Sequence, residues 1–179
     1  MPAQLHLLET RRLVLEPVTR AHADEAWPGL DDDRMWTFFP ELRPRSLEHL
    51  RTIYDRRSRG SGDESQIWLN FVCRSRAGGK IVGEVQATIV LPAQASYVAY
   101  DVFTKEQGKG YGREAVRVLI DHVAETYGIR RFLAEIDTRN ARSVALVKSL
   151  GFKQVETHEA VEHGHGLVSN EFVYELTLQ

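Results

Sequence analysis

A glycine-rich turn in the middle of the chain leads from an apolar, strand-like segment directly into an amphipathic helix. The turn spans residues 107–113 and has glycine at positions 108, 110 and 112. Glycine lets the backbone approach a ligand closely and take positive φ angles. The first N–H groups of a helix have no partner within it, and the helix dipole favours negative charge beside them. The segment therefore predicts a site for a phosphate-bearing ligand, although a simple tight turn before a helix would use the same glycines.

The spacing of these glycines limits which phosphate ligand the turn can bind. A Walker loop needs two glycines separated by four residues and followed by Lys and Ser or Thr, and the chain contains no such string. The dinucleotide fingerprint Gly-x-Gly-x-x-Gly is also missing, because the residue at its last position is Arg113. Lys109 and Arg113 add positive charge to the turn, which keeps an anionic ligand as the prediction.

Hydrophobic periodicity organises the chain into one α/β (α+β) domain over residues 1–179. The expected strands cover residues 12–18, 66–74, 80–90, 96–103, 131–137, 152–158 and 170–178. The expected helices cover residues 20–30 with Thr19 as N-cap, a segment that begins at Ser46, a segment that ends before Gly128, and residues 140–150. This order predicts one twisted, mostly antiparallel sheet flanked by helices.

Charge and composition exclude several classes of protein. The formal net charge is −2, so no basic excess points to nucleic acid. No stretch approaches the roughly 20 apolar residues of a membrane span, and the first residues do not show the pattern of a secretory signal. We therefore expect no membrane partner and a cytoplasmic location. The single cysteine, Cys73, is expected to be buried and inert. The stretch 163–166 (His-Gly-His-Gly) has no matching Cys or carboxylate, which predicts a loop and no metal site.

Four short motifs in register resemble those of the GCN5-related N-acetyltransferase (GNAT) superfamily. The first is the loop itself, where Gln107-x-x-Gly110-x-Gly112 is similar to the (Gln/Arg)-x-x-Gly-x-(Gly/Ala) loop of that superfamily. The others are Asn140-Ala141-Arg142-Ser143 with Leu150-Gly151-Phe152, Ile81-Val82-Gly83, and Thr10-Arg11-Arg12-Leu13-Val14-Leu15. The last resembles the opening strand of the branch that includes the ribosomal-protein N-terminal acetyltransferases. The resemblance covers nearly the whole chain.

The resemblance implies a binding mode for acetyl-CoA as co-substrate, without a metal. In that fold the strand before the loop splays from its parallel neighbour, here 131–137, and the pantetheine arm lies in the gap. Backbone groups of Asp101 and Phe103, on either side of Val102, would hold the pantetheine, and Asn140 would hydrogen-bond it. The pyrophosphate would lie on the amides of residues 108–113. The cofactor-binding residues expected on this basis are Asp101, Val102, Phe103, Gln107, Gly108, Lys109, Gly110, Tyr111, Gly112, Arg113, Asn140 and Ser143.

The resemblance also implies direct attack of an amine on the thioester, which needs a base, an oxyanion donor and an acid for the thiolate. Glu84 is the first candidate for the base, with Asp101, Glu135 or a water chain as alternatives, and the Asp101 amide is the candidate oxyanion donor. Many relatives use a tyrosine as acid at the position of Val147. The role therefore moves to Ser143, whose hydroxyl could equally bond a carbonyl one turn back.

The sequence does not identify the acceptor of the acetyl group. It could be the primary amine of a protein N-terminus or of a small molecule, and the aromatic segment 35–40 could form a wall of its pocket or part of the core. A non-catalytic acyl-CoA-binding sensor or regulatory module is the alternative from another class, because the tyrosine at position 147 is missing. Relatives are often dimers, so a homodimer is possible.

Overall fold

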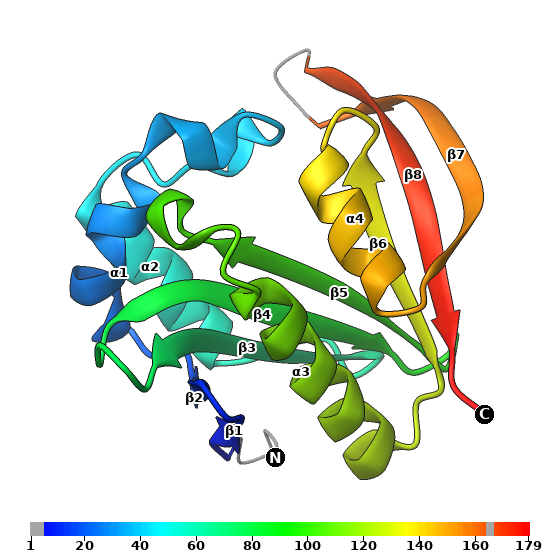
Figure 1. Ribbon diagram of the computed structural model, residues 1–179, viewed down its shortest axis with the longest axis horizontal. Coiled ribbons are helices and arrows are strands. Elements are labelled where there is room, and N and C mark those ends of the chain that lie inside the picture. Colours follow the sequence, from blue (N-terminus) through cyan, green and yellow to red (C-terminus); the bar gives the residue numbers. More distant parts are fainter. Residues whose placement is uncertain (1–5, 164–166) are drawn as a thin grey trace.

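The computed structural model describes residues 6–163 and 167–179, and in this part of the chain one eight-stranded sheet carries helices on both faces (Figure 1). The strands are β1 (Leu8–Glu9), β2 (Leu13–Pro17), β3 (Gln66–Ser75), β4 (Ile81–Val90), β5 (Ala95–Val102), β6 (Arg131–Asp137), β7 (Lys153–Glu162) and β8 (Val168–Thr177). The helices are α1 (His22–Leu30), α2 (Leu47–Ser58), α3 (Tyr111–Tyr127) and α4 (Ala141–Ser149), with short 3-10 helices η1 (Asp33–Trp36), η2 (Pro40–Leu42) and η3 (Thr104–Glu106). The sheet order is β1-β2-β3-β4-β5-β6-β8-β7.

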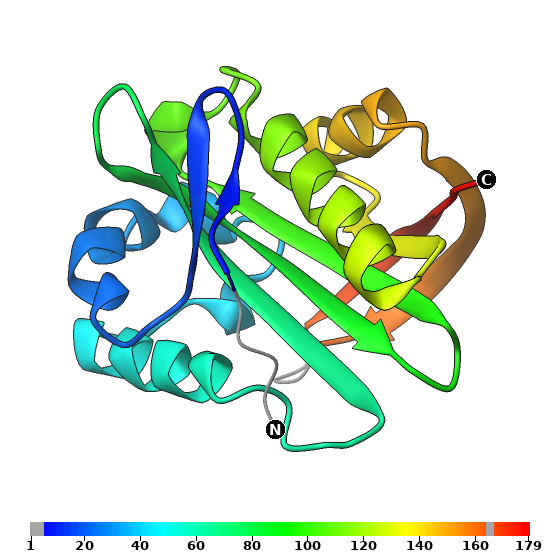
Figure 2. The ribbon, with the colours of Figure 1, turned by 90° about the horizontal axis from the view of Figure 1, so that it is seen from below.

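Two hydrophobic clusters hold the helices to opposite faces of the sheet (Figure 2). On one face, Leu119 and Ile120 of α3 pack with Val85 of β4 in the larger cluster. On the other, Leu50 and Tyr54 of α2 pack with residues of α1 and β3. Alternation along the strands sends odd and even positions to different clusters. A register shift between β3 and β4 interrupts this pattern, so that Ile81 and Val85 belong to different clusters. A strand residue therefore faces either α3 and α4 or α1 and α2.

Strands β5 and β6 form the parallel pair at the centre of the sheet, and they separate early. Their register covers only Ala95–Tyr97 against Arg131–Leu133. Beyond that point β5 stays paired with β4, and β6 stays paired with β8 as far as Asp137. The sheet therefore opens between residues 98–102 and 134–137, towards the ends of both strands. This confirms the expected fold class, including the splayed central strands.

Most expected elements are confirmed to within a few residues, and the differences have local causes. The N-cap assignment of Thr19 is wrong: Ala21 occupies that position without a side-chain cap, and the Thr19 N–H donates to Nδ1 of His22 at 3.0 Å. Ser46 does cap α2, accepting from the His49 N–H at 3.1 Å. Strand β7 runs four residues beyond the expected end, because its register with β8 resumes after a shift between His158 and Val161. No helix in the described part of the chain is long and apolar enough to cross a bilayer.

Gly83 is required by close contact between β4 and β5. A Cβ built at this position would lie 2.1 Å from the carbonyl oxygen of Asp101, which is a backbone atom and cannot move aside alone. We expect Gly83→Ala to lower the stability by about 1–3 kcal/mol, the usual range for overpacking, and the melting temperature by roughly 3–10 °C. A Cβ at Gly78 meets nothing within 4 Å, so Gly78→Ala is the matched control. Equal melting temperatures for the two variants would contradict this account of the contact.

Candidate active site

The turn before α3 presents a row of free backbone donors. Among the described residues, no acceptor pairs with the N–H groups of 108–113. Gly110 stands at the N-cap with φ 81° and offers no capping side chain, and Gly108 has φ 79°. Both φ values lie in the left-handed region that glycine favours. The turn is therefore shaped to direct several N–H groups and the positive end of the α3 dipole at one anion.

Side chains from both halves of the sheet fix this turn in place. Arg12, the residue before β2, donates to the Lys109 carbonyl at 2.8 Å and pairs with Glu114 of α3 at 2.6 Å. Gln107 donates to the Val102 carbonyl at 3.0 Å and accepts a hydrogen bond from Arg142 of α4. The side-chain amide of Gln107 thus links the loop to β5 and to α4. The bonds to Arg12 and Arg142 are contacts that the sequence pattern did not reveal, because both partners are distant in the chain.

The register of β5 decides which of its backbone groups face the gap. The Phe103 N–H donates to the Val82 carbonyl of β4 at 2.9 Å, and the Phe103 carbonyl accepts from Glu106 at 2.7 Å. Because directions alternate along an antiparallel ladder, the Asp101 N–H also points to β4, and the N–H groups of Tyr100 and Val102 point to the gap. The expected backbone roles of Asp101 and Phe103 are therefore wrong by one residue. The side chains of Asp101 and Phe103 face α1 and α2.

The first turn of α4 lies across the gap from β5. Asn140 caps the helix by accepting from the Ser143 N–H at 3.1 Å, and its amide nitrogen has no acceptor within the described chain. The Ser143 hydroxyl does not bond a carbonyl one turn back. It lies 2.6 Å from the hydroxyl of Tyr100 on β5. Val147 is fully buried in the core, so its position offers no polar group.

Glu84 is tied into a buried network on the α1 and α2 face. One carboxylate oxygen accepts from the Tyr54 hydroxyl, and the other lies 2.9 Å from a guanidinium nitrogen of Arg57. The Glu84 side chain is only 6% exposed and both oxygens are engaged. A carboxylate held in this way needs to break an ion pair before it can accept a proton. The geometry gives Glu84 the role of fixing α2 to the sheet.

Asp101 lies opposite Glu84 in the β4–β5 register, on the same face of the sheet. No side chain of the described residues donates to its carboxylate, and Asp101 keeps partial exposure. Burial, and next the charge of Glu84, raise the pKa of Asp101 to about 6, which the Arg57 charge only partly offsets. A half-buried carboxylate with a pKa near neutrality and no fixed partner has the properties of a general base.

The same face carries further acidic groups on the far side of the gap. Glu135 of β6 is exposed, and Asp137 is buried and paired with Arg139 at 2.6 Å. Glu171 of β8, the register partner of Asp137, has a pKa raised by burial. Glu171 also lies 3.3 Å from Nε2 of His163. These acidic groups of β6 and β8 lie on the far side of the gap from Asp101.

The aromatic segment 35–40 contributes in part to the core. Met35 and Trp36 pack against the α1 and α2 cluster. Phe38 lies under the guanidinium of Arg139 at 5.9 Å, and Phe39 meets the ring of His163 edge-on at 5.8 Å. The two phenylalanines thus connect the N-terminal half to the residues that follow β6 and β7.

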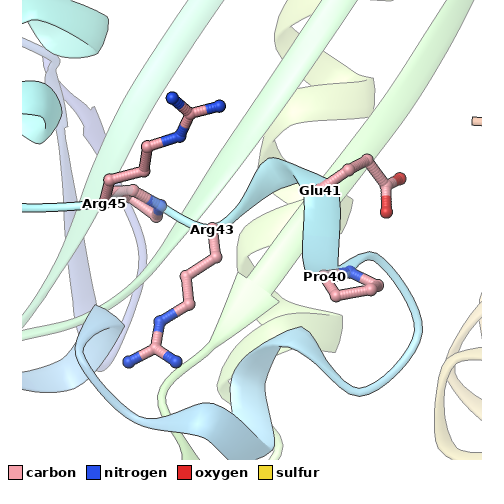
Figure 3. Close-up of a pocket in the computed structure, with 5 residues that line it drawn as sticks. Pro40, Glu41, Arg43 and Arg45 are labelled. Carbon is pink, nitrogen blue, oxygen red and sulfur yellow. The ribbon is translucent and has the colours of Figure 1, made fainter. Parts of the chain in front are cut away.

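A hollow of about 400 Å³ lies beside this bridge, lined by Pro40, Glu41, Arg43, Pro44 and Arg45 (Figure 3). The Glu41 carboxylate points away from both arginines in Figure 3 and lies 4.0 Å from Nδ1 of His163. Arg43 instead forms ion pairs with Asp31 and Asp33. Neither the free backbone donors of 108–113 nor the open edge of β5 lines this hollow, so we assign the site to the gap.

The remaining sequence predictions concern Cys73 and the histidines. Cys73 is 3% exposed, which confirms that it is buried, and burial raises the pKa of its thiol. Residues 164–166, with His165, lie outside the described residues. Within residues 6–163 and 167–179, no three His, Cys, Asp or Glu side chains are grouped as metal ligands.

Comparison with known proteins agrees with the fold and with the anion-binding turn described above. Residues 12–153 match the family model described as "Acetyltransferase (GNAT) domain". The chain is 35% identical over 97 residues to an N-acetyltransferase 9-like protein of Caenorhabditis elegans, and this match covers 54% of the chain and 38% of that relative. The chain therefore aligns with less than half the length of that curated relative.

Solved structures share the fold at low sequence identity. The RimL ribosomal L7/L12 α-N-protein acetyltransferase has a TM-score of 0.83 at 17% identity, covering 97% of this chain and 94% of that one. The microcin C7 self-immunity acetyltransferase MccE, solved with acetyl-CoA and AMP, has a TM-score of 0.81 at 18% identity and covers 94% of each chain. These likenesses establish the fold.

The Glu84–Arg57 pair provides a test of the buried network. Arg57→Met should leave the Glu84 charge uncompensated and lower the stability at neutral pH by about 2–3 kcal/mol, less than for a fully buried pair because Arg57 is partly exposed. Urea denaturation at neutral pH measures this. Arg59→Met, which breaks only the surface pair with Asp55, is the control. Equal stabilities for the two variants would contradict the assignment.

Proposed function

The chain belongs to the acetyltransferase (GNAT) domain family, and from this we propose that it transfers the acetyl group of acetyl-CoA to a primary amine by direct attack. The observation that carries the proposal is the row of free N–H groups at 108–113 beside the opened β5–β6 gap. The row fits a pyrophosphate, and the gap fits an extended arm that can bond to the free edge of β5. Acetyl-CoA supplies the activated acyl group as a thioester.

Each part of the ligand has suitable partners in the chain. The amides of 108–113 would bind the pyrophosphate, with the exposed Arg113 nearby. The gap-facing backbone of Tyr100 and Val102 would pair with the pantetheine, and the free amide nitrogen of Asn140 would donate to one of its carbonyls. The carbonyl of Val102 already accepts from Gln107, so Val102 offers its N–H. This N–H is also suited to the negative charge that develops on the thioester oxygen.

Asp101 is the residue that we propose as general base. Its side chain faces α1 and α2, the face opposite to α3 and α4, so the amine would approach from one side of the sheet and the cofactor from the other. Its pKa of about 6 leaves it ionised at neutral pH and basic enough to accept a proton from an ammonium group. Glu84 is held by Tyr54 and Arg57 and would act on Asp101 through its charge.

The acceptor would be a cationic amine of small cross-section. Asp101 lies on one side of the gap, Glu135 and Glu171 lie on strands of the other side, and the contacts of Phe38 with Arg139 and of Phe39 with His163 join the two sides. These features favour a small-molecule amine. An extended protein N-terminus is also a cationic amine of small cross-section and would fit the same opening. Thiol release from acetyl-CoA across a panel of polyamines, aminoglycosides and N-terminal peptides tests the choice. Acetyl-CoA binding without turnover on any amine would favour a regulatory binding module.

Acetyl-CoA should stabilise the fold, and ATP and NAD should not. At a hundred times its dissociation constant a ligand adds about 2.7 kcal/mol, which raises the melting temperature by roughly 5–10 °C.

Gly110→Ala should place a side chain at φ 81°, at a strain of about 1–2 kcal/mol, and weaken acetyl-CoA binding roughly tenfold or more. Gly62, at φ 71° with nothing within 4 Å, gives the control Gly62→Ala, which is strained but distant from the turn. Equal affinities for both variants by calorimetry would refute the pyrophosphate site.

Asp101→Asn should remove the acidic limb of the pH–rate profile near pH 6. At neutral pH the rate should fall roughly a hundredfold and recover at high pH, where the amine arrives deprotonated. Glu84→Gln should keep the limb and move it to lower pH, because the Glu84 charge helps to raise the pKa of Asp101. Since burial raises the pKa of Asp101, its contribution to stability declines as the pH rises from about 4 to about 6. Asp101→Asn should therefore melt higher than the native protein at about pH 8 and not at about pH 4, a readout that needs no acceptor. A retained limb in Asp101→Asn would place the base elsewhere.

A further inference from the structure

One hydrogen bond between side chains spans the opening between β5 and α4. The Tyr100 hydroxyl on β5 lies 2.6 Å from Oγ of Ser143 and 3.1 Å from the Ser143 carbonyl oxygen. Tyr100 comes three residues after the last β5 residue paired with β6, so its side chain reaches over the part of the gap where the strands have separated. Ser143 itself is fixed, because its N–H donates to the Asn140 side chain at 3.1 Å.

The protons of the two hydroxyls have two possible arrangements. If Tyr100 donates to the Ser143 carbonyl, the Ser143 hydroxyl donates to Tyr100. The single proton of Ser143 is then not available to another acceptor. If Tyr100 donates to Oγ of Ser143, the Ser143 proton is free for another acceptor in the gap. Each hydroxyl has a single proton, so an anion in the gap would select the second arrangement. In that arrangement Tyr100 both orients Ser143 and strengthens it as a donor.

The surroundings leave this pair without a competitor on α4. The other hydroxyl of that helix, on Ser149, donates to the Leu146 carbonyl at 2.6 Å on the exposed side. Position 147 is a buried valine. Tyr100 is therefore the second hydroxyl available beside Ser143 in the gap, although it comes from a strand that precedes α4 by about 40 residues.

We propose that Tyr100 is a positioning residue that directs the Ser143 hydroxyl at the sulfur of the leaving CoA. The inference rests on the proposed function. As the amine displaces the thiol, the carbon–sulfur bond breaks and its electron pair passes to sulfur. Ser143 donates a hydrogen bond to the thiolate and Tyr100 donates one to Ser143. Both keep their protons, and solvent later protonates the thiolate.

The surroundings of Tyr100 suit a donor that stays protonated. Burial raises the pKa of Tyr100 to about 12, with Asp101 acting in the same direction and the bond to Ser143 against it. Tyr100 thus remains a donor throughout the range in which a thiol of pKa about 8.5 ionises. The titration of bound CoA can therefore be followed without ionising Tyr100.

The test uses CoA alone, so it needs no acceptor. The thiolate of bound CoA is titrated by ultraviolet absorbance, with the complex of desulfo-CoA as blank. In the native protein the bound thiol should be more acidic than free CoA. Tyr100→Phe and Ser143→Ala should each reduce its acidity constant by about tenfold, the order expected for a hydrogen bond to a charged group. The double variant should match Ser143→Ala alone, because Tyr100 acts through Ser143. Tyr97→Phe, at an exposed tyrosine of the same strand, is the control.

The outcomes separate this inference from the proposed function. Failure of the native protein to bind CoA or desulfo-CoA overturns both. If Tyr100→Phe binds CoA and the bound thiol is as acidic as in the native protein, Tyr100 does not have the proposed role. If the effects of the two substitutions on the acidity of the thiol add up in the double variant, Tyr100 does not act through Ser143. Desulfo-CoA should bind all variants equally by calorimetry, which excludes a general loss of the site. With an acceptor in hand, a selenoester analogue should reduce the kcat defect of both single variants, since a selenolate leaves with little assistance.

Discussion

Strands β5 and β6 share a register of only three residue pairs, and beyond it the gap-facing N–H and C=O groups of β5 have no strand partner. Unpaired backbone groups are tolerated where water or a ligand can reach them and are unfavourable where the chain buries them. The opening can therefore persist only at the surface end of the sheet, and that is where the loop and α4 begin. Gly83 sets the same geometry from the other side, because it lets the Asp101 carbonyl approach β4.

The two faces of the opened sheet have different chemistry because strand positions alternate. Even positions of β5, such as Tyr100 and Val102, send side chains towards α3 and α4, and odd positions send Asp101 and Phe103 towards α1 and α2. Hydroxyl groups and free amides thus gather on the cofactor side, and carboxylates gather on the side proposed for the amine. Glu84 influences the carboxylates on the amine side. Its own charge is paired with Arg57, and it still raises the pKa of its neighbour Asp101.

The sequence was sufficient for the order of elements, the fold class and the loop, because these depend on periodicity and on local glycine geometry. It could not assign backbone direction on β5, since a shift of one residue exchanges the two sides of a strand. It placed the base on Glu84 because nothing local shows that Tyr54 and Arg57, some 30 residues earlier, occupy both oxygens. The partnership of Tyr100 with Ser143 was hidden for the same reason, as contacts between distant segments leave no spacing pattern.

The contacts that cross the gap are made by side chains, and this has a consequence for how the site adapts. Arg142 with Gln107, Tyr100 with Ser143, and Phe39 with His163 each join one half of the sheet to the other. Side chains change rotamer more easily than paired strands change register, so these links can rearrange around an inserted arm while the strands stay in place. The sheet beyond the gap is held by full ladders and by the α3 cluster. The width of the opening is therefore a property of a few polar and aromatic contacts, and a ligand that replaces their hydrogen bonds can enter without disturbing the core.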